Sequence, residues 1–129
     1  MRQIIFRGRS LRTGEWLYGD LLRNENGAVA VVPPFKLNEY NECSDYEVDK
    51  DSVGQFVGVS DKNGVAVYEG DLVRYYDETE DELVTRPVEY LGDYCAFCAV
   101  HQKRDPDGIF AQWEYEVVGN IHDKKESDG

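Results

Sequence analysis

Short apolar segments alternate along the chain with turn sequences rich in glycine, asparagine and aspartate. Valine, tyrosine and phenylalanine fill many of these segments, and neighbouring positions often switch between apolar and polar, which is typical of strands. No window of about ten residues shows the apolar stripe of an amphipathic helix. The pattern therefore predicts a mainly β protein.

The second half of the chain is the more regular one. The pattern predicts strands at residues 72–76, 84–90, 94–101 and 110–121. Pro87 lies inside the second of these, and because proline has no backbone N–H to donate, it indicates an edge strand or a bulge.

Two segments, FRGRSLRTGEWLYGDLLR at 6–23 and FVGVSDKNGVAVYEGDLVR at 56–74, share one pattern with Glu69 inserted in the second. In each copy a strand leads to a turn that contains glycine, a second strand follows, and a Gly-Asp pair breaks it. A duplication explains the match, although convergence on one hairpin pattern remains an alternative. We interpret these positions as structural turns: Gly14, Gly19, Asp20, Gly64, Gly70 and Asp71.

The formal net charge is −12, and it is spread unevenly. Residues 1–23 carry +3, residues 24–100 carry −12 and the remainder carries −3. A protein that binds nucleic acid through its phosphates normally has the opposite balance, so nucleic acid is not the expected partner. The acidic run 77–82 is interpreted as a solvated loop tip. The alternative is that the chain binds a single nucleic-acid strand through a small basic face with interleaved aromatic residues. This face would be formed by Arg2, Arg7, Arg9, Arg12, Arg23, Phe6, Trp16 and Tyr18.

Three cysteines, an odd number, argue against a disulfide framework. The N-terminus has too short an apolar run for a signal peptide, and no stretch is long enough for a membrane span. We therefore expect a cytoplasmic protein that has no contact with a membrane.

Cys95 and Cys98 have CxxC spacing, but they lie within a predicted strand, where residues three apart point to opposite faces. A zinc site would also need ligands from Cys43, His101 and His122, so we interpret the pair as buried structural thiols and leave the metal alternative open. The acidic pairs in the loop and on the last strand are interpreted as solvated surface. No catalytic, cofactor-binding or metal-binding residue is predicted.

The text VGQFVGVSDKNGVAVYEGDLVRY from Val53 onward, together with the closing YEVVGNIHD, resembles the YopX family of phage and prophage proteins. The opening FRGRSLRTGEWLYGDL is similar to the start of that family. The resemblance implies a small, mostly β protein encoded among phage accessory genes, and it carries over no catalytic residue. We therefore expect a small SH3-like barrel at 53–122. The sequence pattern itself predicts an N-terminal β unit with a polar connection at 1–52 and a frayed tail at 123–129.

These observations favour a non-enzymatic phage or prophage accessory protein that binds another protein, with a homo-oligomer as one form of this. The first alternative is a nucleic-acid-related role, in which either the Arg-rich N-terminal face binds a strand or the acidic middle mimics DNA. The second alternative is an enzyme with a site that the sequence does not reveal.

Overall fold

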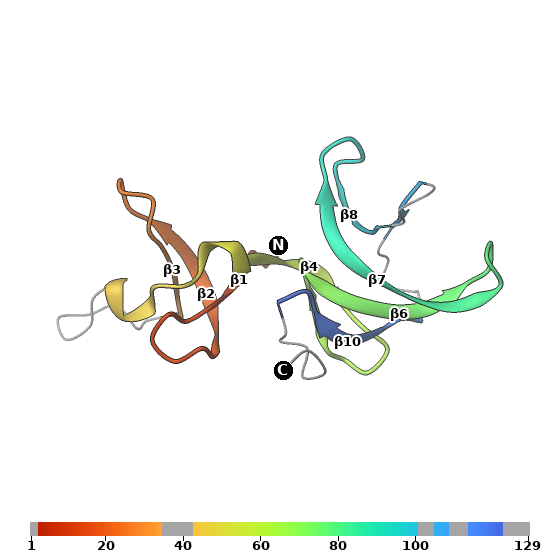
Figure 1. Ribbon diagram of the computed structural model, residues 1–129, viewed down its shortest axis with the longest axis horizontal. Coiled ribbons are helices and arrows are strands. Elements are labelled where there is room, and N and C mark those ends of the chain that lie inside the picture. The colour runs from red at the N-terminus through yellow and green to blue at the C-terminus, as the bar shows by residue number, and fades with distance from the viewer. Residues whose placement is uncertain (1–2, 35–42, 101–104, 109–113, 123–129) are drawn as a thin grey trace. The chain divides into compact units, whose positions relative to one another are not determined.

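The computed structural model describes residues 3–34, 43–100, 105–108 and 114–122, and every structural statement below concerns these ranges (Figure 1). They contain strands joined by turns, two short 3-10 turns and no α-helix. The prediction of a mainly β protein is confirmed. The predicted tail, 123–129, lies outside the described residues.

The chain divides into two compact units, Met1–Phe56 and Val57–Gly129. The sequence had suggested a division between residues 52 and 53. The first unit contains β1 (Phe6–Arg9), β2 (Trp16–Arg23), β3 (Val29–Val32), the 3-10 turns η1 (Cys43–Tyr46) and η2 (Lys50–Ser52), and the start of β4 (Gly54–Ser60).

The core of the first unit forms around β3, because this strand consists only of valine and alanine. Val31 is fully buried, and Val32 and Val48 are almost so. Val48 packs so closely against Gly8 on β1 that a Cβ atom added there would lie 2.9 Å from the Val48 side chain. Strand β1 is flanked by antiparallel neighbours on both sides, since Arg7 lies opposite Tyr18 and also opposite Gly54.

The second unit contains the rest of β4 and six further strands. The first sheet has the order β3-β2-β1-β4-β5, and the second has the order β10-β6-β7-β8-β9. The six strands are β5 (Ala66–Tyr68), β6 (Asp71–Asp77), β7 (Glu82–Leu91), β8 (Ala96–Ala99), β9 (Asp107–Gly108) and β10 (Glu116–Asn120).

Strict alternation along β6 builds the core of the second unit. Every second residue of this strand is buried, so Val73 and Tyr75 pack into the apolar cluster. The same alternation places Asp71 and Asp77 on the buried face, one at each end of the strand. The other buried members of the cluster are Val67, Val88, Ala99 and Tyr115.

The expectation that Pro87 marks an edge strand or bulge was wrong. β7 lies inside the second sheet, between β6 and β8, and in Figure 1 it forms a long curved hairpin with β6. Pro87 is tolerated because it lies where pairing changes: it is opposite Leu72, the last residue of the β6–β7 ladder, while pairing with β8 starts at Val88. The carbonyl of Pro87 accepts from the nitrogen of Val100 at 2.9 Å, and the absence of an N–H at Pro87 falls at the end of the pairing with β8 rather than within it.

Strand β8 is shorter than the predicted strand 94–101, because residues 92–95 form a turn. Of the predicted strand 110–121, residues 116–120 form β10, residues 114, 115 and 121 are not in a strand, and residues 109–113 lie outside the described part of the chain. Among the described residues both sheets are open rather than closed. The SH3-like barrel and the duplication therefore remain predictions.

Candidate functional site

The turn glycines of the two matching segments lie at hairpin tips. Gly14, between β1 and β2, has φ 77°, and Gly64, between β4 and β5, has φ 82°. A Cβ atom disfavours this left-handed conformation, which explains why glycine stands at both tips.

The repeated Gly-Asp pair occupies two different environments. Gly70 has φ 93° in the turn between β5 and β6, and the backbone nitrogen of Tyr68 donates to Oδ2 of the buried Asp71 at 2.7 Å. Gly19 and Asp20 lie inside β2 instead, and Asp20 is exposed. The same two residues thus form a bend in one copy and continue a strand in the other.

Asp61 is a buried carboxylate at the turn between β4 and β5. Its Oδ1 accepts from the backbone nitrogens of Asn63 at 2.8 Å and Val65 at 2.9 Å, and its Oδ2 accepts from the nitrogen of Val117 on β10 at 2.8 Å. Burial alone would raise the pKa of Asp61, but these three hydrogen bonds outweigh it, so the pKa lies below its usual value. With all three bonds directed to backbone, the role of this carboxylate is structural.

The CxxC cysteines differ in environment. Cys98 is buried on β8, and burial raises the pKa of its thiol. Cys95 is exposed in the turn before β8, with φ 51°, so the expectation of two buried thiols was wrong for Cys95. The side chain of Cys43 and all of His101 lie outside the described residues, and the described residues contain no group of His, Cys, Asp or Glu that could hold a metal ion.

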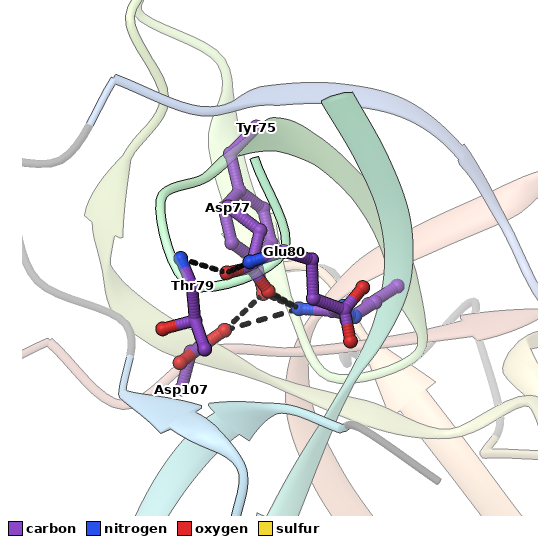
Figure 2. A network of polar contacts seen from close by, with 6 residues as sticks. Tyr75, Asp77, Thr79, Glu80 and Asp107 are labelled. Carbon is purple, nitrogen blue, oxygen red and sulfur yellow. Dashed lines mark hydrogen bonds and ion pairs between the residues drawn. The ribbon is translucent and has the colours of Figure 1, made fainter. Parts of the chain in front are cut away.

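Among the described residues, the most concentrated polar arrangement includes Tyr75, Asp77, Glu80 and Asp107, which Figure 2 labels. At its centre is Arg86, which lies on the buried face of β7 opposite Val73. Its Nη1 donates to Asp77 Oδ2 at 2.6 Å, to the Tyr75 hydroxyl at 2.9 Å and to Asp107 Oδ2 at 3.2 Å. Its Nη2 donates to Glu80 at 3.1 Å. The Tyr75 hydroxyl in turn donates to Asp107 Oδ2 at 2.6 Å.

Asp77 also organises the adjacent turn. Its Oδ1 accepts from the backbone nitrogens of Thr79 at 2.9 Å and Glu80 at 3.2 Å, while Oδ2 holds Arg86 (Figure 2). The interpretation of the run 77–82 as a solvated loop tip was therefore wrong for Asp77, because this residue is only 4% exposed. It is buried because it ends the inward-facing series of β6 and pairs there with a buried guanidinium.

This network fixes the protonation states of its members. Burial would lower the pKa of Arg86, but the hydrogen bonds to Asp77 and Tyr75 outweigh it and raise the pKa further. Burial and the bond to Asp107 raise the pKa of Tyr75 to about 12. At neutral pH the arginine is therefore charged and the tyrosine is a neutral donor.

Beside this network lies a cleft of about 480 Å³. Among the described residues that line it, four are acidic and none is basic, and none is a cysteine or a histidine. The arrangement supplies hydrogen-bond acceptors, negative charge and aromatic rings, which suits recognition of a ligand better than nucleophilic chemistry. The described lining residues are Tyr75, Tyr76, Asp77, Glu78, Thr79, Asp107 and Glu114.

Sequence reasoning missed Arg86, Asp107 and Asp61. The strict alternation of β6 was a signal for a buried Asp77, since positions 73, 75 and 77 share one face. No signal in the sequence links Asp107 to Tyr75, because they are 32 positions apart.

Not all members of the predicted basic face lie on the surface. The guanidinium carbons of Arg7 and Arg9 lie 4.4 Å and 4.7 Å from the centre of the Trp16 ring, which is a cation–π geometry. Arg7 is buried, so it packs within the unit and is not part of an exposed surface. Tyr18 is 46% exposed.

None of the helical segments in the described ranges is long and apolar enough to cross a membrane. A comparison with curated proteins returned no match. The profile of the YopX protein family matches residues 5–126, which is nearly the whole sequence. The chain therefore belongs to the YopX family.

Proposed function

We propose that this chain is a non-enzymatic accessory protein of phage or prophage origin. It acts in the bacterial cytoplasm by binding another protein through the cleft lined by Tyr75, Asp77 and Asp107. Membership of the YopX family supports the phage-type origin. The SH3-like barrel and the duplicated hairpin unit belong to the same proposal. The matching glycines at the two hairpin tips, Gly14 and Gly64, support the duplicated unit, and the five-stranded antiparallel second sheet supports the barrel.

The main support for a binding role comes from the ion pairs and hydrogen bonds around Arg86, beside the cleft. Arg86 already engages Asp77, Glu80 and Asp107 in ion pairs, so these carboxylates hold a buried cation and are poor candidates for proton transfer. Tyr75, with a pKa of about 12, is likewise not a base at neutral pH. Acidic side chains held in place beside a cleft suit the binding of a ligand.

A DNA mimic is the second candidate, and the distribution of charge favours it. The second unit, 57–129, carries 17 acidic and seven basic residues, a net of −10, and therefore holds most of the negative charge of the chain. A mimic would bind the basic groove of a host protein mainly through this charge, so its complex should weaken steeply with salt.

The test is a tagged pull-down from host lysate after nuclease treatment, washed at low and at moderate salt. Three proteins are compared: the natural sequence, the cleft variant Glu78→Gln/Glu114→Gln, and the control variant Glu25→Gln/Glu89→Gln. The control removes the same amount of charge at exposed residues outside the cleft.

Capture of one protein by the natural and control chains but not by the cleft variant, at moderate salt, is the expected result. Equal capture by all three chains would rule out the cleft as the binding surface. Capture that is lost from all three on raising the salt would favour the DNA mimic. Turnover of a defined substrate by the purified chain would overturn the non-enzymatic proposal.

A further inference from the structure

The cleft beside Arg86 contains more negative than positive charge. Arg86 is in contact with Asp77, Glu80 and Asp107, so one guanidinium faces three carboxylates. Glu78 and Glu114 line the same cleft, and neither has an ion-pair partner among the described residues. A further cation in this space would therefore lower the electrostatic energy of the site.

The shape and aromatic walls of the cleft indicate a ligand independently of this charge. Its volume of about 480 Å³ lies in the range of pockets that take organic ligands and is far larger than a single ion requires. Tyr75 and Tyr76 both contribute atoms to its lining, and Tyr75 lies on the same inward face of β6 as Asp77. An aromatic ring beside carboxylates suits a cation on an apolar stem, because the stem packs on the ring while the charge meets the acids.

Other ligand classes fit these walls less well. An anion would face four acidic side chains, and no basic residue lines the cleft among the described ones. The described carboxylates also do not converge into a group that could hold a metal ion. An organic cation is the class of ligand that remains. The protein already holds one such group in this way, since the guanidinium of Arg86 lies 5.7 Å from the centre of the Tyr75 ring and pairs with Asp77.

We propose that the cleft receives an arginine or lysine side chain that the partner protein presents. This inference rests on the proposed function and adds the chemistry of the partner to it. Arginine fits better than lysine, because its planar guanidinium can pair with a carboxylate through two hydrogen bonds and stack on an aromatic ring.

The experiment is a nitrogen–proton NMR titration of the full chain with N-acetyl-arginine amide. A single residue is used because a polycationic peptide would bind anywhere on a chain with net charge −12. N-acetyl-citrulline amide is the neutral control with nearly the same shape. We expect saturable shifts for the arginine compound, with a dissociation constant in the millimolar range (about 1–20 mM). These shifts should be centred on the amides of Tyr76, Glu78, Thr79 and Glu114.

The cleft variant Glu78→Gln/Glu114→Gln should weaken this binding about 3- to 10-fold, because it removes two exposed ion pairs. The control variant Glu25→Gln/Glu89→Gln should change it less than about 2-fold. The spectrum of each free variant reports whether it is folded, so a loss of binding cannot be confused with unfolding.

Equal shifts from citrulline and arginine, shifts outside the cleft, or no shift at about 20 mM ligand would each overturn the inference. The proposed function fails by a different result, namely equal pull-down by the natural chain and the cleft variant. A cleft-dependent partner combined with a negative titration would retain the binding function and reject the cationic side chain.

Discussion

Asp61 accepts a hydrogen bond at 2.8 Å from the backbone nitrogen of Val117, which lies 56 positions further along the chain. The other carboxylate oxygen accepts from the nitrogens of Asn63 and Val65, within the turn. One side chain thus stabilises the turn between β4 and β5 with one oxygen and joins it to β10 with the other. Because each oxygen of Asp61 has its own hydrogen-bond partners, a mutation can remove one role and keep the other.

Asp61→Asn should reduce the free energy of unfolding by about 2 kcal/mol at pH 7. The amide oxygen can replace Oδ1 and preserve the turn, but the amide NH₂ would then face the N–H of Val117, so two donors would oppose each other. Urea unfolding measures the loss, and hydrogen exchange should show it at the Val117 amide rather than at Val65. Equal loss of protection at both amides would contradict the separate roles of the two oxygens.

The contribution of Asp61 should also depend on pH, with a sign that follows from its lowered pKa. A carboxyl whose pKa is lower in the folded than in the unfolded chain stabilises the fold above the unfolded pKa, near 3.8. That contribution disappears as the pH falls through the lower folded value. The difference in stability between the natural chain and Asp61→Asn should therefore shrink in acid, and a difference that grows below pH 4 would contradict this assignment.

The sequence predicted the mainly β class because alternation and turn residues are local signals, and these place β6, β7 and β10 close to their observed positions. It could not predict the network around Arg86. Tyr75 and Arg86 lie on the paired strands β6 and β7, whereas Asp107 lies on β9, which pairs with β8. Only the three-dimensional fold of the second sheet brings the three side chains together. The charge-rich run 77–82 was similarly ambiguous, since the composition of a loop does not reveal which carboxylate faces inward.

The repeated glycines show a second limit of local patterns. Gly70 needs glycine for its positive φ of 93°. Gly19 also has a positive φ, 155°, and in addition needs glycine for space, because an added Cβ would lie 2.0 Å from the Val32 carbonyl oxygen on the neighbouring strand. The two matching glycines therefore share one physical requirement, and Gly19 has a second.

Alanine substitutions should show how much the steric clash at Gly19 adds to the cost of a positive φ. Gly70→Ala should cost about 1–2 kcal/mol from backbone strain, since its nearest neighbour, the His122 ring, is 3.6 Å from the added Cβ. Gly19→Ala should cost more, because β2 and β3 must move apart. Gly92→Ala is the matched control, with nothing within 4 Å of its Cβ and no positive φ. Chemical denaturation ranks the three variants, and a Gly19→Ala protein as stable as the control would disprove the steric reason.

Removing the buried guanidinium should be much more damaging than removing its exposed partner. Arg86→Met should cost about 3–5 kcal/mol, because Asp77 would remain buried without a cation. Glu80→Gln should cost less than about 1 kcal/mol, since the Glu80 side chain is 32% exposed. The double variant Asp77→Asn/Arg86→Met should recover part of the loss. Urea unfolding of these proteins and of the single variant Asp77→Asn provides the comparison, and a loss in the double variant equal to the sum of the Asp77→Asn and Arg86→Met losses would show that the pair is not coupled.

Two buried tyrosines should respond in opposite directions to the loss of a hydroxyl. Tyr115 is 1% exposed, and its hydroxyl has no hydrogen-bond partner among the described residues, so burial of this group costs free energy. Tyr115→Phe keeps the ring and removes that cost, which should leave stability unchanged or raise it by up to about 1 kcal/mol. The hydroxyl of Tyr75, by contrast, donates to Asp107 and accepts from Arg86, so Tyr75→Phe should lower stability by about 1–2 kcal/mol.

Thermal and urea unfolding at pH 7, where both hydroxyls are neutral, compare the same chemical change at two sites. A destabilised Tyr115→Phe protein would indicate that a buried water satisfies that hydroxyl, and a fully stable Tyr75→Phe protein would contradict a stabilising role for the network around Arg86.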